Sequence, residues 1–478
     1  MTRRTKIVAT VGPASQSEQI ISELISAGVD VFRLNFSHGD IEQHAAVAQR
    51  IRKQATRQGR YVGILADLQG PKIRIGVFRD DSVALNEGDR FSLDLNIAPG
   101  EGTARGVGLE YSELPNQVKR DDILLLDDGR IRLQVESVDG ACVETRVTVA
   151  GQLGSRKGIN RLGGGLAAPA LTHKDMIDIE GLTRIEPDFV AVSFVSSAQD
   201  ILQTKDLLAE QGLTPAIIAK IERAEVVNDE TTLNDIISAS WGVMVARGDL
   251  GVEVGDAALI GIQKALISQA RKMDRVVITA TQMMESMINS STPTRAEVFD
   301  VANAVLDGTD AVMLSAETAI GNYPLAVVNA MADTCIGAEQ HPSTRTSRYR
   351  IDRAFSSAQE SIAMSAIYAA NHHSSVRGIA CLTESGTTPL LMSRLSSGRP
   401  IFALSNNQQT LQRLCLCRGV VPLYFDATAF DTDEVDARAI EYIKSCGYLQ
   451  TDDEIILTKG MVMGRPGNTN IMKVLPVP

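Results

Sequence analysis

Four charged residues lie where two short apolar segments end. Lys220 and Glu222 lie at the end of Ala216–Ile221, and Arg247 and Asp249 follow the next apolar segment of the chain. Both segments have the character of buried parallel strands, in which unpaired charge is heavily penalised, so the four side chains are expected to meet at one site. Two carboxylates with two cations suit a divalent metal ion that holds a phosphorylated anion.

The alternative is a pair of structural salt bridges at the two strand ends. Buried ion pairs are weak stabilisers, and strongly perturbed charged groups cluster at functional sites. The functional interpretation is therefore favoured, and the structural one remains the competing hypothesis.

Apolar segments of strand length alternate regularly with helical patterns in two parts of the chain. The eight predicted strands are Lys6–Val11, Val29–Asn35, Tyr61–Asp67, Phe189–Phe194, Ala216–Ile221, Gly242–Arg247, Val276–Thr281 and Ala311–Ser315. Eight strand–helix units predict an α/β fold of the (β/α)8 TIM-barrel type.

Polar residues occur where these strands end, which is the face on which such barrels carry out chemistry. They are Arg33, Asn35, Asp67, Lys220, Glu222, Arg247, Asp249, Thr281, Ser315 and Glu317. A doubly wound open sheet is the alternative fold, but it would bring only the residues at one switch point together.

The alternation is interrupted after the third predicted strand. Residues 71–169 contain short alternating strands and turn dipeptides, as in DDILLLDDGRIRLQVESVDG, and predict an inserted all-β domain. The barrel is accordingly assigned to residues 1–70 and 170–340. Helix and strand alternate again in residues 341–478, which are expected to form a C-terminal α/β domain.

The third region contains the segment TESGTTP, in which an apolar strand ends and a helix is expected to begin. Hydroxyl groups and backbone N–H groups at such a turn can bind phosphate. The residues in question are Thr383, Ser385, Gly386, Thr387 and Thr388. An ordinary strand-to-helix turn with a Ser or Thr cap explains the segment equally well.

The composition is that of a globular enzyme. The chain has 478 residues, is 44% hydrophobic and only 4% aromatic, and carries a formal net charge of -11, which argues against general nucleic-acid binding. It has no apolar run of about 18 residues and no signal-type N-terminal segment, so a cytoplasmic location is expected. Its six cysteines have no metal-binding spacing and are expected to be free thiols.

The motifs resemble those of pyruvate kinase over essentially the whole chain. They include RLNFSHG, GSRKGIN, IIAKIERAE, VMVARGDLGVE, ITATQMMESM and TESG. The resemblance implies a catalytic barrel, an inserted β-barrel lid, a C-terminal effector-binding domain and, usually, a homotetramer. It also implies transfer of the phosphoryl group of phosphoenolpyruvate to ADP, which gives pyruvate and ATP in the last step of glycolysis.

The resemblance further implies a role for individual residues. The substrate-binding positions correspond to Arg33, Lys220, Arg247, Gly248, Asp249 and Thr281. Of these, Lys220, Arg33 and Thr281 would be catalytic. Glu222 and Asp249 would bind Mg²⁺ or Mn²⁺.

Two further groups of positions follow from the same resemblance. The nucleotide-binding residues correspond to Asn35, His38, Arg74 and Lys157. The monovalent-cation region corresponds to Asn35, Ser37, Asp67, Leu68 and Lys72.

This sequence departs from the family pattern at the monovalent-cation region. Most members have Asp-Thr-Lys-Gly-Pro-Glu, whereas this chain has DLQGPK, with Leu68 in place of threonine and Lys72 in place of glutamate. A tethered ammonium could replace K⁺, so activity without K⁺ is expected. The alternative is that Lys72 points into solvent and that the pocket still binds K⁺.

A second departure concerns the effector. The tryptophan of sugar-bisphosphate-regulated members is absent from KGMVMGRPGNTN, and Thr387 stands where those members carry a basic residue. AMP or a sugar monophosphate is therefore a better expectation than fructose 1,6-bisphosphate.

Two other functions fit the same barrel. A catalytically silent phosphate-sensing protein would be expected to lack Lys220 or a metal-binding carboxylate, but all are present. A magnesium-dependent aldolase acting on pyruvate enolate would share the carboxylates and an arginine, but it would not need a lid, a nucleotide-binding lysine or the C-terminal phosphate loop.

Overall fold

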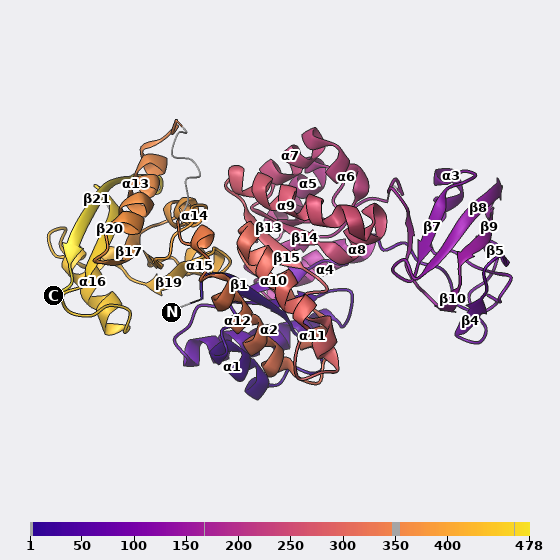
Figure 1. Cartoon of the computed structure of the whole chain (residues 1–478), viewed down its shortest axis with the longest axis horizontal. Helices are drawn as coiled ribbons and strands as arrows, with labels where there is room; N and C mark the ends of the chain where they lie inside the picture. Colours follow the sequence, from indigo (N-terminus) through magenta and orange to yellow (C-terminus); the bar gives the residue numbers. More distant parts are fainter. Residues whose placement is uncertain (1–2, 167, 347–353, 463) are drawn as a thin grey trace.

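The computed structural model describes residues 3–166, 168–346, 354–462 and 464–478. Three parts lie in a row, with a closed barrel between a small β domain and an α/β domain (Figure 1). Residues 347–353, near the start of the predicted third domain, lie outside the described residues.

The central part is a closed barrel of eight parallel strands in the order β1-β16-β15-β14-β13-β12-β3-β2. The strands are β1 (Lys6–Thr10), β2 (Val31–Asn35), β3 (Gly63–Asp67), β12 (Phe189–Val192), β13 (Ala216–Ile221), β14 (Gly242–Ala246), β15 (Val276–Ala280) and β16 (Ala311–Leu314). Pairing of β1 with β16, which starts at Lys6 and Ala311, closes the barrel. The predicted (β/α)8 fold is confirmed, and the open sheet is excluded.

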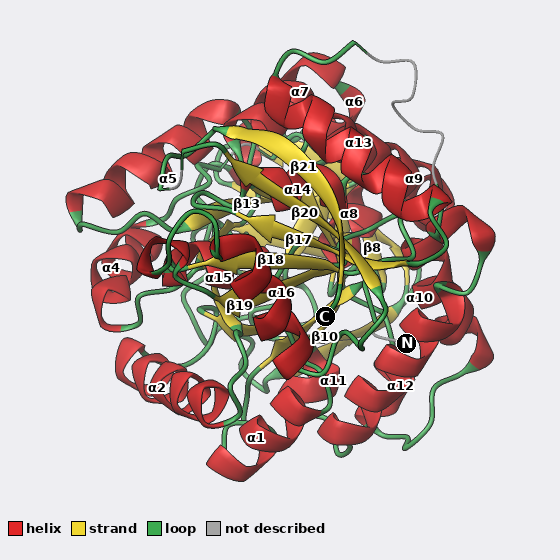
Figure 2. Ribbon diagram, turned by 90° about the vertical axis from the view of Figure 1, so that its left-hand side faces the viewer, coloured by secondary structure: helices red, strands yellow, loops and turns green. Residues whose placement is uncertain are grey.

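Helices surround the barrel, as the view from its C-terminal-domain side shows (Figure 2). The main ones are α1 (Glu18–Ser26), α2 (Ile41–Arg57), α4 (His173–Gly181), α5 (Ala198–Glu210), α7 (Glu230–Ala239), α9 (Asp256–Lys272), α10 (Arg295–Asp307) and α12 (Pro324–Ala338). Side chains of Ser17, Asp40 and Thr294 cap the first backbone N–H groups of α1, α2 and α10. These caps explain why the three helices begin at Glu18, Ile41 and Arg295.

Apolar side chains bury both faces of the barrel strands. Val8, Leu65, Phe189, Ile218 and Met244 belong to one buried cluster. The remaining strand side chains pack against the surrounding helices in a second cluster. Burial on both faces explains the nearly continuous apolar segments and leaves the strand ends as the place for polar groups.

The inserted domain is built from short strands, as expected. They are β4 (Ser82–Leu85), β5 (Arg90–Asp94), β6 (Gly106–Val107), β7 (Ile123–Leu126), β8 (Ile131–Asp139), β9 (Cys142–Val149), β10 (Gly151–Gly154) and β11 (Ile159–Arg161). Six of them form one sheet in the order β11-β7-β8-β9-β5-β6, and β10 pairs with β4. The sheet has its own apolar core, which includes Phe91 and Leu133.

The C-terminal part has a five-stranded sheet in the order β19-β18-β17-β20-β21. The elements are α13 (Ala358–His372), β17 (Val376–Leu382), α14 (Thr387–Ser393), β18 (Ile401–Ser405), α15 (Gln408–Leu414), β19 (Val420–Tyr424), α16 (Val435–Ser445), β20 (Glu454–Gly460) and β21 (Thr469–Pro476). Arg394, just after α14, forms a fully buried ion pair with Asp310 at the start of β16. This pair joins the domain to the barrel.

All six cysteines are free thiols, as predicted. Among the described helices, none combines the length and apolarity needed to cross a membrane.

Candidate active site

Lys220, at the end of β13, is the centre of a buried charge cluster. Its Nζ lies 3.0 Å from Glu222 Oε1 and 3.3 Å from Asp67 Oδ1, and it donates a hydrogen bond of 2.6 Å to Ser193 Oγ. Burial alone would lower the pKa of Lys220, but Asp67 and Glu222 raise it above its usual value. The side chain is therefore an ammonium at neutral pH.

Asp67, at the end of β3, joins two cations. Its Oδ2 accepts a 2.6 Å hydrogen bond from Arg33 Nε, while Oδ1 faces Lys220. Burial raises the pKa of Asp67, but Lys220 and Arg33 outweigh burial and hold it below its usual range. The formal charges of Lys220 and Arg33 match those of the Asp67 and Glu222 carboxylates.

Glu222 and Asp249 have the chemistry that a divalent metal ion requires. Burial and the Asp249 carboxylate raise the pKa of Glu222, although Lys220 opposes them, so the two carboxylates repel each other. A divalent cation between them would relieve that repulsion. No group of three or more His, Cys, Asp or Glu side chains suited to a metal occurs in the described part of the chain. Two carboxylates nevertheless fit Mg²⁺, which usually keeps waters and substrate oxygens as its other ligands.

Arg247 follows the end of β14 and holds the neighbouring backbone in place. Helix α8 (Arg247–Val254) begins directly after β14, at the residue that the sequence assigned to the end of the strand. The Arg247 guanidinium is buried, binds both Asp300 carboxylate oxygens at 2.7 and 2.8 Å, and donates to Thr281 O at 2.7 Å. It is thus occupied by neighbouring side chains and carbonyls.

Thr281 is held in an unusual conformation by these contacts. Its Oγ1 accepts a 2.7 Å hydrogen bond from Gly248 N, and both Thr281 (φ 67) and Gln282 (φ 53) adopt left-handed backbone geometry. Such geometry costs about 1–3 kcal/mol for each residue other than glycine, and residues that adopt it cluster at functional sites. The structure therefore brings together Gly248, Thr281 and Arg247, three of the residues predicted to bind the substrate.

A cleft of about 460 Å³ separates this end of the barrel from the inserted domain. It is lined on the barrel side by Asp249, Thr281 and Ser315, and on the other side by Asp128 in the β7–β8 turn. The Ser315 hydroxyl is buried and lacks a hydrogen-bond partner among the described residues, so it is available to a ligand. Lys72 Nζ lies 3.7 Å from Asp249 Oδ1 and 4.0 Å from Asp128 Oδ1.

Comparison with known proteins gives the family of this chain. The family model of the pyruvate kinase barrel domain matches residues 2–328, and that of the pyruvate kinase alpha/beta domain matches residues 360–475. The chain belongs to the pyruvate kinase family. It is 54% identical to a pyruvate kinase of Haemophilus influenzae over 96% of each chain, and 53% identical to pyruvate kinase II of Salmonella typhimurium over 99% of each chain. It is also 39% identical to a pyruvate kinase of Thermococcus litoralis over 99% of each chain.

The four residues predicted to bind the nucleotide are divided between the barrel and the inserted domain. Lys157 pairs with Asp127 at 2.8 Å, and Arg74 donates to a carbonyl of the inserted domain at 2.9 Å. His38 is exposed after β2, and Asn35 ends that strand. None of the four is among the described residues that line the cleft.

The predicted monovalent-cation region is divided in the structure. Ser37 N donates to Asn35 Oδ1 at 3.2 Å, and Leu68 is buried. Lys72 pairs with Asp249 and Asp128, and no ion pair joins it to Asp67 within the described residues. Its ammonium therefore lies beside Asp249, one of the two predicted metal ligands.

The predicted phosphate loop follows β17, and α14 begins at Thr387 with Pro389 in its first turn. Ser385 is exposed, and its hydroxyl lies 2.9 Å from that of Thr387. Gly386 N donates to Thr383 Oγ1 at 3.0 Å, which closes the turn.

Thr388 differs from the other residues of this loop. It is fully buried, and its hydroxyl bonds Thr469 and Gln359 at 2.8 Å each. The structure thus leaves Ser385 and Thr387 as the loop's accessible hydroxyls.

Sequence reasoning missed three residues that hold the cluster. Ser193 accepts from Lys220, Thr10 accepts from Arg33 at 3.1 Å, and Phe194 donates its backbone N–H to Glu222 Oε2 at 2.6 Å. Thr10 and Ser193 lie near the ends of predicted strands, and this position could have marked them as site residues. A backbone donor such as that of Phe194 leaves no trace in the sequence.

Proposed function

We propose that this chain transfers the phosphoryl group of phosphoenolpyruvate to ADP, giving pyruvate and ATP, with Mg²⁺ or Mn²⁺ as the divalent cofactor. The observation that carries the proposal is the buried cluster of Lys220, Glu222, Asp67 and Arg33 beside the cleft. A preorganised cation set among carboxylates stabilises charge that is shared between donor and acceptor oxygens during phosphoryl transfer.

The roles of the chain's own residues follow from this arrangement. Lys220 contacts the moving phosphoryl group, and Arg33 neutralises its remaining charge. A cation held by Glu222 and Asp249 would supply positive charge to the phosphate and carboxylate oxygens. The backbone from Arg247 to Asp249 holds the substrate carboxylate, and Arg247 itself positions that backbone.

Thr281 helps to deliver the proton to the enolate, through water. The support is its fixed position: Gly248 N donates to its hydroxyl, and the strained backbone is held by Arg247. We assign Arg74, Lys157, Asn35 and His38 to the nucleotide on resemblance, with Arg74 and Lys157 approaching from the lid. We also propose the family's usual homotetramer on resemblance.

A coupled assay tests the reaction. Purified protein, phosphoenolpyruvate, ADP and Mg²⁺ are mixed, and pyruvate is followed through NADH oxidation by added lactate dehydrogenase. Pyruvate that appears only with ADP supports the proposal. No pyruvate would favour a silent binding protein. In a separate mixture of pyruvate, an aldehyde and Mg²⁺, a condensation product would favour an aldolase.

We propose that catalysis does not require K⁺. Lys72 Nζ lies 3.7 Å from Asp249, so a tethered cation already lies beside the metal-binding carboxylates. With tetramethylammonium as the only monovalent cation, the parent should be nearly as active as with K⁺. Lys72→Glu combined with Leu68→Thr should acquire a K⁺ requirement, because it removes the tethered charge and adds a carboxylate.

The control for this prediction is Lys119→Glu, which changes an exposed lysine of the same inserted domain. It should leave the response to K⁺ unchanged. Strong activation of the unmodified protein by K⁺ would contradict the role of Lys72.

We further propose that a phosphate monoester, AMP or a sugar monophosphate, activates the enzyme by binding at Thr383–Thr388. Ser385→Asp should abolish activation and leave the unactivated rate almost intact, because it places a like charge beside the phosphate. Ser385→Ala is the matched variant that removes the hydroxyl without adding charge, and it should retain part of the activation. Steady-state rates with and without each ester measure both variants, and equal activation of Ser385→Asp and parent would refute the location.

A further inference from the structure

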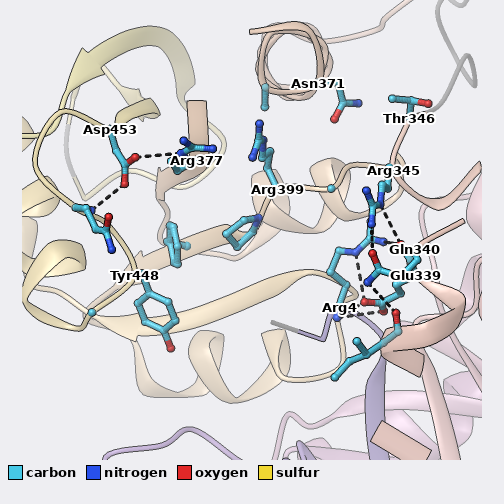
Figure 3. Close-up of a pocket in the computed structure, with 17 residues that line it drawn as sticks. Arg4, Glu339, Gln340, Arg345, Thr346, Asn371, Arg377, Arg399, Tyr448 and Asp453 are labelled. Atoms are coloured by element: carbon cyan, nitrogen blue, oxygen red, sulfur yellow. Dashed lines mark hydrogen bonds and ion pairs between the residues drawn. The ribbon is translucent and has the colours of Figure 1, made fainter. Parts of the chain in front are cut away.

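A second large cavity lies between the barrel and the C-terminal domain, far from the charge cluster around Lys220. Its volume is about 830 Å³, within the range of small-molecule sites. The amino ends of β17, β18 and β20 form one side, and the chain after α12 forms the other (Figure 3). We call it the seam cavity.

Four arginines of the described part of the chain line the seam cavity, and they have different neighbours. Arg377 pairs with Asp453 at 3.0 Å, and Arg4 pairs with Glu339 at 3.5 Å. Arg345 lies beside Arg4 in Figure 3. Arg399 stands between these groups, and no dashed line reaches it.

Arg399 has no carboxylate partner among the described residues. Its guanidinium donates a single hydrogen bond, of 3.3 Å, to the carbonyl of Ser374. Burial, with a contribution from Arg377, lowers the pKa of Arg399. Arg377 disfavours the charged form of Arg399 because the two guanidinium groups repel each other. A bound anion would interact favourably with both cations.

A small adjoining cavity shows the same excess of positive charge. Arg4 and Arg399 line it as well, together with Arg418. Arg418 is buried, and its Nη2 has no hydrogen-bond partner in the described structure. Burial, together with Arg4 and Arg271, lowers the pKa of Arg418 to about 10, although Glu339 opposes this. Among the described residues that line the two cavities, arginines therefore outnumber carboxylates.

We infer that the seam cavity binds a phosphate monoester that carries a ring, with Arg399 as its main phosphate contact. A guanidinium fork matches phosphate oxygens, and a monoester carries about −1.5 to −2 charges at neutral pH. Tyr448 lines the cavity, packs on Phe402 with ring centroids 5.0 Å apart, and offers a partly exposed aromatic surface to a sugar or base.

This site goes beyond the proposed function and is separate from the loop at Thr383–Thr388. That loop follows the carboxyl end of β17, whereas the seam cavity lies at its amino end. A ligand that contacts Arg399 and Arg4 would bridge the C-terminal domain and the barrel. It would therefore stabilise the two domains together.

Titration calorimetry on the full-length protein tests the inference, with AMP and glucose 6-phosphate as separate probes and inorganic phosphate as the ring-free probe. Ser385→Asp is the background, so that the loop at Thr383–Thr388 does not contribute. At least one ester should bind this background, and adding Arg399→Gln should weaken binding at least about tenfold, as expected for loss of charge-assisted hydrogen bonds. The Arg399→Lys variant should bind the ester with intermediate affinity, because lysine keeps the positive charge but lacks the planar guanidinium that can donate two parallel hydrogen bonds.

Arg438→Gln is the matched control, because it removes a half-exposed arginine of the same domain that pairs with Glu434. It should bind the ester like the background. Equal affinity of the Arg399→Gln and Arg438→Gln variants would overturn the inference, as would the absence of binding by both esters. Inorganic phosphate that binds as tightly as the better ester would refute the ring contact.

The variants also need a folding control. An unchanged near-ultraviolet circular dichroism spectrum shows that Arg399→Gln is folded, and Arg399→Lys serves as the test if it is not. If the protein converts phosphoenolpyruvate and ADP but binds neither ester, the seam site is refuted and the proposed reaction is not.

Discussion

Replacing Lys220 by Met slows phosphoryl transfer by about 10²- to 10⁴-fold, the range for one preorganised electrostatic group. The substitution nearly conserves the volume of the side chain but removes the ammonium that lies 3.0 Å from Glu222 and 3.3 Å from Asp67. Stopped-flow or steady-state formation of ATP from phosphoenolpyruvate and ADP measures the loss.

Lys53→Met is the control for this prediction. Lys53 pairs with Glu18 on the barrel surface and is half exposed, so its loss should leave phosphoryl transfer unchanged. A Lys220→Met protein with near-normal ATP formation would show that the role assigned to Lys220 is wrong.

Replacing Glu222 by Gln or Asp249 by Asn sharply raises the Mg²⁺ concentration needed for half-maximal rate. Each change removes an anionic oxygen ligand while keeping the shape of the side chain. Loss of an outer-shell partner already costs about 10- to 100-fold in metal affinity, so loss of a direct ligand should cost at least that. Magnesium titrations of the initial rate measure the effect.

Glu230→Gln serves as the control, because Glu230 is an exposed residue at the start of α7. Its magnesium titration should match that of the parent. Unchanged titrations of both the Glu222 and Asp249 variants would contradict their assignment as metal ligands.

The barrel could be predicted because its signals are local. Each strand is an apolar segment buried on both faces, and the helix caps at Asp40 and Thr294 mark the starts of two helices. Lys220 and Asp67 are far apart in the sequence, but both end barrel strands, so the topology brings them together. The meeting of Lys220 and Asp67 could therefore be predicted from their positions at the ends of strands.

The parts that could not be predicted depend on backbone geometry or domain packing. Helix α8 begins directly at Arg247, and this turns its guanidinium toward Asp300. The left-handed conformation of Thr281 is imposed by tertiary contacts rather than by its residue type. The approach of Lys72 to Asp249 depends on how the inserted domain lies over the barrel, which no local pattern encodes.

The most direct test of the central claim measures both halves of the reaction in Lys220→Met. Exchange of the methyl protons of pyruvate in D₂O, followed by NMR with Mg²⁺ present, reports proton transfer, and ATP formation reports phosphoryl transfer. The account predicts that proton exchange survives while ATP formation falls at least about 100-fold. Parallel loss of both would show that Lys220 only maintains the site, and this would contradict its assignment to the moving phosphoryl group.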